Sequence, residues 1–163
     1  MLNSVPVPLQ AILWPLAGAV FTLMFSRLLP NWARRLLAMA AALASLAALW
    51  SLRGGVGEPV EIIWTPLQFF RMSPMLYPDG LSLLVGIMLA GVTSAVVLSM
   101  PGCEPRKTVW HSLILVVLAG CLAVTMAANL LALALGSALI DLALVTIVIL
   151  TADDAQASQR NAL

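Results

Sequence analysis

The sequence predicts an all-α integral membrane protein, a bundle of five transmembrane helices with one long outer loop between the second and third spans. Hydrophobic residues make up 62% of the chain and charged residues only 9%, whereas soluble domains carry about a quarter charged residues. The mean hydropathy is +1.04. Charged residues, prolines and glycines divide the apolar sequence into five runs of about 20 residues each, the length that crosses a bilayer as a helix. We therefore expect one five-helix domain over residues 1–152 and a polar tail over residues 153–163.

The first two spans are expected at residues 9–29 and 32–52. Pro15 should lie in the early turns of the first helix, where a missing backbone donor does least damage, and Pro30 should close that helix. Asn31 can cap the second helix. The N-terminus lacks the basic flank of a cleavable signal, so the first apolar run is expected to remain as a span.

The long loop covers residues 53–78 and contains four prolines and a short β-prone run at residues 60–64. We expect it to form an ordered cap on the membrane surface. The third span follows at residues 79–100. It opens at Asp79, whose carboxylate can accept hydrogen bonds from free backbone donors of the first turn.

The fourth and fifth spans are expected at residues 108–127 and 130–151, separated by a tight turn at Asn129. Such a short connection makes these two helices antiparallel neighbours. Small residues in spans three to five predict close helix packing. They are Gly86, Gly91, Ser94, Ser99, Gly120, Gly136 and Ser137. The tail, 153–163, offers nothing to bury and is expected to be flexible unless a partner holds it.

Basic residues predict the orientation. They gather between spans one and two and between spans three and four, at Arg27, Arg34, Arg35, Arg106 and Lys107. That side should be cytoplasmic. The N-terminus would then lie outside and the C-terminus on the cytoplasmic side. The paired basic residues would also meet anionic lipid head groups.

Composition excludes several functions. The net charge is only +1, and no basic stripe supports nucleic-acid binding. Cys103 and Cys121 have no metal or redox spacing. We find no phosphate-binding loop, no catalytic triad and no pair of axial histidines, so we expect no catalytic residue, no cofactor and no bound metal.

Asp141 is the most informative residue, because it interrupts the fifth apolar span near its middle. A carboxylate at that depth costs at least about 2.5 kcal/mol and normally faces protein or a water path. Three interpretations are open: a structural hydrogen bond to Ser137, Thr146 or a neighbouring backbone, a polar contact with a partner, or a role in a proton path. His111, near the start of span four, is a weaker proton-path candidate and a stronger candidate for a hydrated interfacial anchor.

Two segments carry a family resemblance. Residues 77–84, Tyr-Pro-Asp-Gly-Leu-Ser-Leu-Leu, resemble the Asp-Gly-Leu-Ser signature that opens the third span in antiporter-like subunits of respiratory complex I and of multisubunit cation/proton antiporters. Residues 129–138, which begin Asn-Leu-Leu, are similar to that family's entry into its fifth span. The opening Trp-Pro-Leu-Ala-Gly-Ala at residues 14–19 and the Pro-rich loop fit the same pattern.

The resemblance covers the N-terminal five-span portion of that family, whose members continue into further spans with functional lysines. The family's glutamate in span five corresponds to Ala138 here, and Asp141 follows about 4.5 Å along the helix axis. Asp141 could be a displaced substitute for this glutamate or unrelated to it, and the matching lysine would have to come from another polypeptide.

The resemblance thus implies a non-redox membrane subunit of a larger respiratory or ion-translocating complex, either a proton-translocating NADH:quinone oxidoreductase-like complex or a cation/proton antiporter. Its partners would be other membrane subunits and lipids. Its location would be the bacterial inner membrane or an equivalent energy-coupling membrane. Two alternatives remain: a non-conducting structural or assembly subunit, and a small homo-oligomeric channel built around Asp141.

Overall fold

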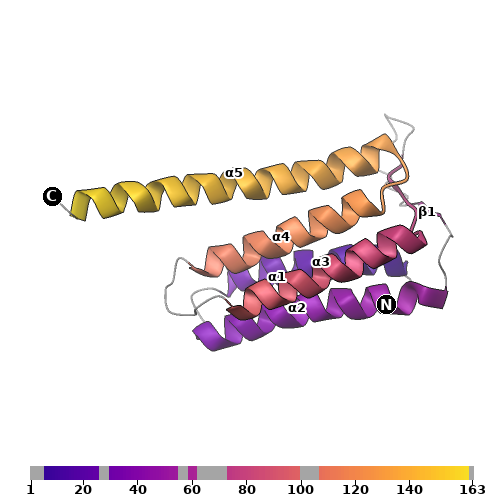
Figure 1. Cartoon of the computed structure of the whole chain (residues 1–163), viewed down its shortest axis with the longest axis horizontal. Coiled ribbons are helices and arrows are strands. Elements are labelled where there is room, and N and C mark those ends of the chain that lie inside the picture. Colours follow the sequence, from indigo (N-terminus) through magenta and orange to yellow (C-terminus); the bar gives the residue numbers. More distant parts are fainter. Residues whose placement is uncertain (1–5, 26–29, 55–58, 62–72, 100–106, 162–163) are drawn as a thin grey trace.

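The computed structural model describes residues 6–25, 30–54, 59–61, 73–99 and 107–161. Within these ranges it contains five α-helices, a short 3₁₀ turn and two short strands (Figure 1). In chain order they are α1 (Val7–Met24), α2 (Asn31–Ser51), η2 (Leu52–Gly54), β1 (Val60–Glu61), β2 (Met75–Leu76), α3 (Gly80–Ser99), α4 (Lys107–Thr125) and α5 (Leu130–Asn161).

The protein is an all-α membrane protein, as the sequence predicts. Four segments are long and apolar enough to cross a membrane: Val7–Met24, Trp32–Gly54, Gly80–Ser99 and Leu130–Ala152. The apolar part of α4, Val109–Thr125, is shorter than these four.

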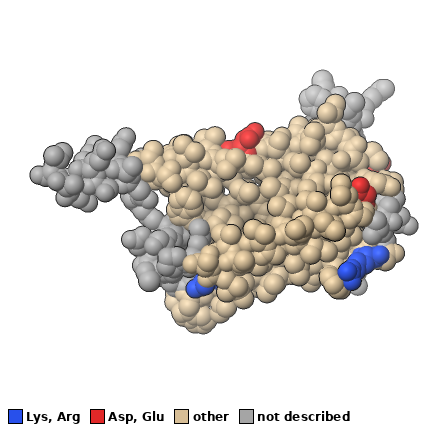
Figure 2. All heavy atoms as spheres, viewed as in Figure 1, with Lys and Arg blue, Asp and Glu red and all other residues tan. Residues whose placement is uncertain are grey.

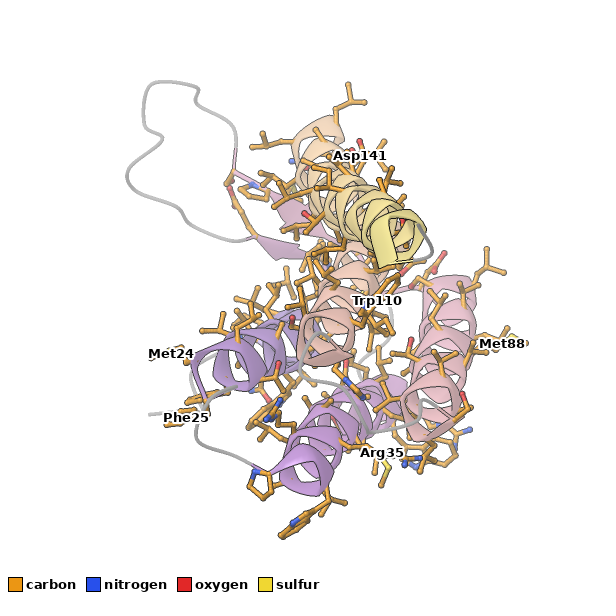
Figure 3. The ribbon with its side chains drawn as sticks, turned by 90° about the vertical axis from the view of Figure 1, so that its left-hand side faces the viewer. Met24, Phe25, Arg35, Met88, Trp110 and Asp141 are labelled. Atoms are coloured by element: carbon orange, nitrogen blue, oxygen red, sulfur yellow. The ribbon has the colours of Figure 1, made fainter. Side chains whose placement is uncertain are left out.

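Helix α4 lies at the centre of the bundle. It packs against α1, α2 and α3 on one side and against α5 on the other (Figure 3). Its side chains fill much of the core, where Leu115 and Leu122 are fully buried and Leu118 is 2% exposed. The helix with the shortest apolar segment is therefore enclosed by the others, and α5 is attached to the bundle mainly through it.

Helices α4 and α5 approach each other closely at two glycines. A Cβ atom placed on Gly120 would lie 2.7 Å from Ile140 Cγ1 and 2.9 Å from the Gly136 carbonyl oxygen. On Gly136 it would lie 2.8 Å from Val124 Cγ2. These separations are far below normal carbon contacts of about 3.5–4.0 Å, so the predicted close packing is confirmed at this crossing. Gly91 differs, because nothing lies within 4 Å of its Cβ position.

Helices α1 and α2 are joined by a buried hydrogen bond to a backbone carbonyl that Pro15 leaves without a helical donor. This proline lies in the middle of α1 and not in its early turns, because the helix begins at Val7. Proline has no N–H, so the carbonyl of Ala11, four residues earlier, loses its helical donor. The Ser45 hydroxyl of α2 donates to that carbonyl at 2.5 Å. A side chain from a neighbouring helix thus satisfies the backbone group that the proline frees, as lipid surroundings require.

The described end of the long loop, residues 73–79, is fixed to the turn between α4 and α5, whereas residues 55–58 and 62–72 lie outside the described part of the chain. Strands β1 and β2 pair antiparallel, with Val60 opposite Leu76, which agrees with the β-prone run where the structure describes it. The Tyr77 N–H donates to the Met126 carbonyl at 2.7 Å, and the Ala128 N–H donates to the Met75 carbonyl at 2.9 Å. The segment around β2 therefore holds the point at which the chain enters α5.

Several helix boundaries differ from the prediction. Helix α1 ends at Met24, five residues before the expected end, and α2 begins at Asn31 itself, with Pro30 at the N-cap position. The largest difference is at the other end of the chain, where α5 continues to Asn161 through most of the expected flexible tail. No proline or glycine follows Thr151 to stop the helix.

Candidate functional site

Asp141 lies midway along the apolar segment Leu130–Ala152, about 16 Å from either end at helical rise. Its side chain is exposed and points away from the rest of the bundle (Figure 3). In the space-filling view, basic atoms appear at the two ends of the molecule, whereas an acidic group interrupts the apolar surface over α5 (Figure 2). The carboxylate therefore faces the membrane region and not the interior of this chain.

The hydroxyl groups nearest to Asp141 in the sequence are engaged elsewhere. The Ser137 hydroxyl donates to the Ala134 carbonyl at 3.0 Å, and the Thr146 hydroxyl donates to the Leu142 carbonyl at 2.7 Å. Both donate within α5 itself. Among the residues that the structure describes, no hydrogen bond or ion pair reaches Asp141, so the structural interpretation through Ser137 or Thr146 loses its support.

Helix α5 is the least covered span. Only 11% of its apolar window is buried within the chain, against 39% for α1 and for α2 and 28% for α3. Large apolar side chains surround Asp141 on the exposed surface: Leu142 and Val148 are 66% and 64% exposed. The uncovered face of α5 thus combines lipid-like side chains with one carboxylate at mid-depth.

The structure does not bring the other sequence-predicted residues to Asp141. Ala138, at the family's glutamate position, is exposed and lines an apolar groove of ≈ 720 Å³ between α1 and α5, but Asp141 does not line this groove. His111 is only 5% exposed and lies within the bundle, so the expectation of a hydrated interfacial histidine is wrong. The carboxylate faces outward, and the imidazole is enclosed.

The two motif residues outside the spans have clear structural roles. The Asp79 carboxylate accepts the Ser82 N–H at 2.6 Å, and the Ser82 hydroxyl bonds back to the Asp79 backbone, so this pair caps α3 as predicted. The hydrogen bonds from Ser82 lower the pKa of Asp79 below its usual value of 3.8. Asn129 caps α5 by accepting the Ala132 N–H at 2.9 Å, and its amide donates to the Ser73 carbonyl at 2.7 Å.

The interior of the bundle offers little polar chemistry. The buried polar side chains of the described residues are Thr22, Ser45, Ser82, His111 and Ser112. In the described part of the chain, no group of three or more histidines, cysteines or carboxylates could hold a metal ion. Cys121 is half-buried in α4, and Cys103, Arg27 and Arg106 lie outside the described residues. The hydrogen bond from the Ser45 hydroxyl to the Ala11 carbonyl was not predicted from the sequence. Pro15 does indicate that the carbonyl four residues earlier needs another donor.

Comparison with known proteins does not assign the chain. No protein family model matches the sequence, and no curated protein is significantly similar to it.

Proposed function

We propose that this chain is a membrane subunit of a larger hetero-oligomeric, ion-translocating complex, and that it presents Asp141 on α5 to a partner subunit. The observation that carries this proposal is the exposed carboxylate at the middle of a span. An uncompensated carboxylate facing lipid costs at least about 2.5 kcal/mol, and the described part of the chain supplies no partner for it. A neighbouring membrane subunit that covers α5 would remove this cost.

The choice of a different partner over a second copy rests on charge. Two copies meeting at this face would bring Asp141 next to Asp141, and like charges in a medium of low dielectric repel strongly. A partner helix with a lysine, arginine or histidine at the same depth would instead form a hydrogen-bonded ion pair. The homo-oligomeric channel is therefore less well supported than a hetero-oligomeric complex.

The kind of complex is proposed from the resemblance. The Asp-Gly-Leu-Ser segment begins α3 and the Asn-Leu-Leu segment begins α5, the positions that these motifs occupy in antiporter-like subunits. We propose a respiratory complex I-like or cation/proton antiporter assembly in an energy-coupling membrane such as the bacterial inner membrane. The distribution of basic residues supports an external N-terminus and a cytoplasmic C-terminus.

A structural or assembly role is the second candidate, and a specific observation favours it. Asp141 points out of the bundle, and the buried polar groups of the described chain are four hydroxyls and one imidazole. In the described interior, one imidazole does not form a continuous relay of acidic and basic groups across the span. The subunit could thus fix the position of a conducting partner without carrying charge itself.

Charge-removing and charge-conserving variants of Asp141 test the proposal in the intact complex. The complex would be purified from native membranes through a tag on this chain, with Asp141→Asn as the test variant and Asp141→Glu as the matched control. Two quantities would be measured: the yield of co-purifying membrane subunits, and ion pumping after reconstitution into liposomes.

The outcomes separate the candidates. Loss of partner subunits in Asp141→Asn but not in Asp141→Glu supports docking through the carboxylate. Intact assembly with slower pumping supports a role in charge transfer. If Asp141→Asn retains full assembly and full pumping, or if the wild-type chain purifies only with copies of itself, the proposal is wrong.

A further inference from the structure

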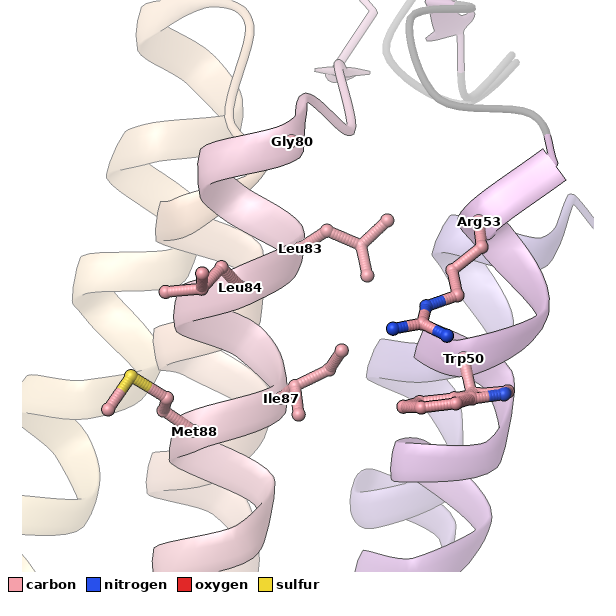
Figure 4. A pocket seen from close by; sticks show the side chains of 7 residues that line it. All are labelled: Trp50, Arg53, Gly80, Leu83, Leu84, Ile87 and Met88. Carbon is pink, nitrogen blue, oxygen red and sulfur yellow. The ribbon is translucent and has the colours of Figure 1, made fainter.

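A second surface feature lies at the opposite end of the span from Arg35, where α2 ends beside the start of α3. An open groove of ≈ 440 Å³ runs between these helices (Figure 4). Its lining residues are Trp50, Arg53, Gly80, Leu83, Leu84, Ile87 and Met88. The volume lies in the range of about 300–1,000 Å³ that is typical of small-molecule sites. Arg53 is the only charged residue in this lining.

The Arg53 side chain is held in place by an aromatic ring. After α2 ends, the chain tightens into η2, and the guanidinium carbon of Arg53 lies 3.6 Å from the centre of the Trp50 ring. This contact is a cation–π interaction. It covers one face of the guanidinium, whereas the N–H donors lie along its edge. Among the described residues no carboxylate forms an ion pair with Arg53.

The chemistry of the groove changes with depth in one direction. Arg53 lies at the end of the membrane segment Trp32–Gly54, and Gly80 begins the next segment. Along α3, Met88 lies about 12 Å deeper in the membrane than Gly80. Figure 4 shows Leu83 and Ile87 pointing from α3 toward Arg53 and Trp50. Figure 4 also shows the Arg53 side chain turned back over Trp50, so the groove places its cation about one helical turn below the membrane surface and the apolar side chains Ile87 and Met88 deeper.

We propose that this groove binds an anionic glycerophospholipid, with its phosphate at Arg53 and one acyl chain along α3. The head-to-tail order of such a lipid matches the order of charge and apolar surface in the groove. A guanidinium recognises phosphate through two parallel N–H···O bonds. A partner protein is less well matched, because the groove opens toward the bilayer: Trp50, Leu84 and Met88 are 53%, 57% and 63% exposed.

Native mass spectrometry of the full chain in detergent tests this inference. The protein would be titrated with phosphatidylglycerol and with phosphatidylcholine of the same acyl composition, and the bound lipids would be counted. We expect phosphatidylglycerol to be preferred, and Arg53→Gln to reduce that preference about fivefold, the effect of one interfacial basic residue. Arg35→Gln is the matched comparison, because it removes an arginine that lies near the other end of α2 and outside the groove. A larger loss of preference in Arg53→Gln than in Arg35→Gln would therefore be due to the groove and not to general surface charge.

A second variant tests the apolar part without changing charge. Ile87→Trp would fill the groove below Arg53 and should reduce the binding of both lipids, and circular dichroism would check that the helices remain. The inference fails if Arg53→Gln and wild-type protein show the same preference, or if Arg35→Gln loses as much preference as Arg53→Gln. It also fails if inorganic phosphate displaces the lipid completely, since that would indicate a phosphate site without a role for the acyl chain.

Discussion

Replacing Ser45 with alanine should destabilise the bundle because Pro15 has already removed the helical donor of the Ala11 carbonyl. Both Ala11 and Ser45 are fully buried, so water cannot replace the lost hydroxyl. An unsatisfied buried carbonyl costs about 1–3 kcal/mol, and interhelical hydrogen bonds in membranes contribute about 0.6–2 kcal/mol. We therefore expect Ser45→Ala to lower the free energy of unfolding by about 1–2 kcal/mol.

The assay is reversible unfolding of the full chain by SDS in mixed micelles, followed by circular dichroism. The decisive measurement is a double-mutant cycle with Pro15→Ala, which restores the backbone N–H four residues after Ala11. In that background Ser45→Ala should cost much less, leaving a coupling energy of about 1 kcal/mol. Ser94→Ala is the control, because the Ser94 hydroxyl donates to the Ala90 carbonyl within its own helix. Equal costs of Ser45→Ala in the two backgrounds would refute the reasoning.

Two further predictions concern the α4–α5 crossing and the start of α3. Gly136→Ala should lower the free energy of unfolding by about 1–3 kcal/mol in the same assay, because the added Cβ atom would collide with Val124. Gly91→Ala is the control and should not destabilise the protein, since nothing lies within 4 Å of its Cβ position. Equal stability of the two variants would contradict the close packing. The lowered pKa of Asp79 means that its capping contribution is complete above its usual value of 3.8 and is lost as the pH falls through the folded-state pKa. Between pH 6 and pH 3 the wild-type protein should therefore lose more stability than the Asp79→Asn variant, whose side chain cannot titrate. If the stability of the two proteins falls in parallel with pH, the hydrogen bonds from Ser82 to the Asp79 carboxylate do not contribute to stability in this way.

The number and order of the helices could be predicted from hydropathy because each span is a separate apolar run. The caps at Asp79 and Asn129 were also predictable, since a short polar side chain before an apolar run has a local partner. The bonds from Asn129 to Ser73 and from Ser45 to Ala11 were not, because they join residues 56 and 34 positions apart. Local patterns carry no information about such pairs.

The depth of Asp141 was predictable, but its direction was not. Helix α5 is apolar on every side, so no amphipathic stripe indicates which face meets α4. The face of α5 that meets α4 is set by Gly120 and Gly136, because their close backbone contact fixes the rotation of α5 about its axis. The extension of α5 was missed for a different reason: polar residues after Thr151 were interpreted as a tail, although they include no helix-breaking residue.

The continuation of α5 to Asn161 has a mechanical consequence. A helix of 32 residues is about 48 Å long, whereas the hydrocarbon core is about 30 Å thick. About 18 Å of the same rod therefore stands clear of the hydrocarbon, on the side opposite the turn at Asn129. A protein in the aqueous phase that bound this extension would therefore hold the same helix that carries Asp141. The close contacts at Gly120 and Gly136 oppose any turning of that helix about its axis.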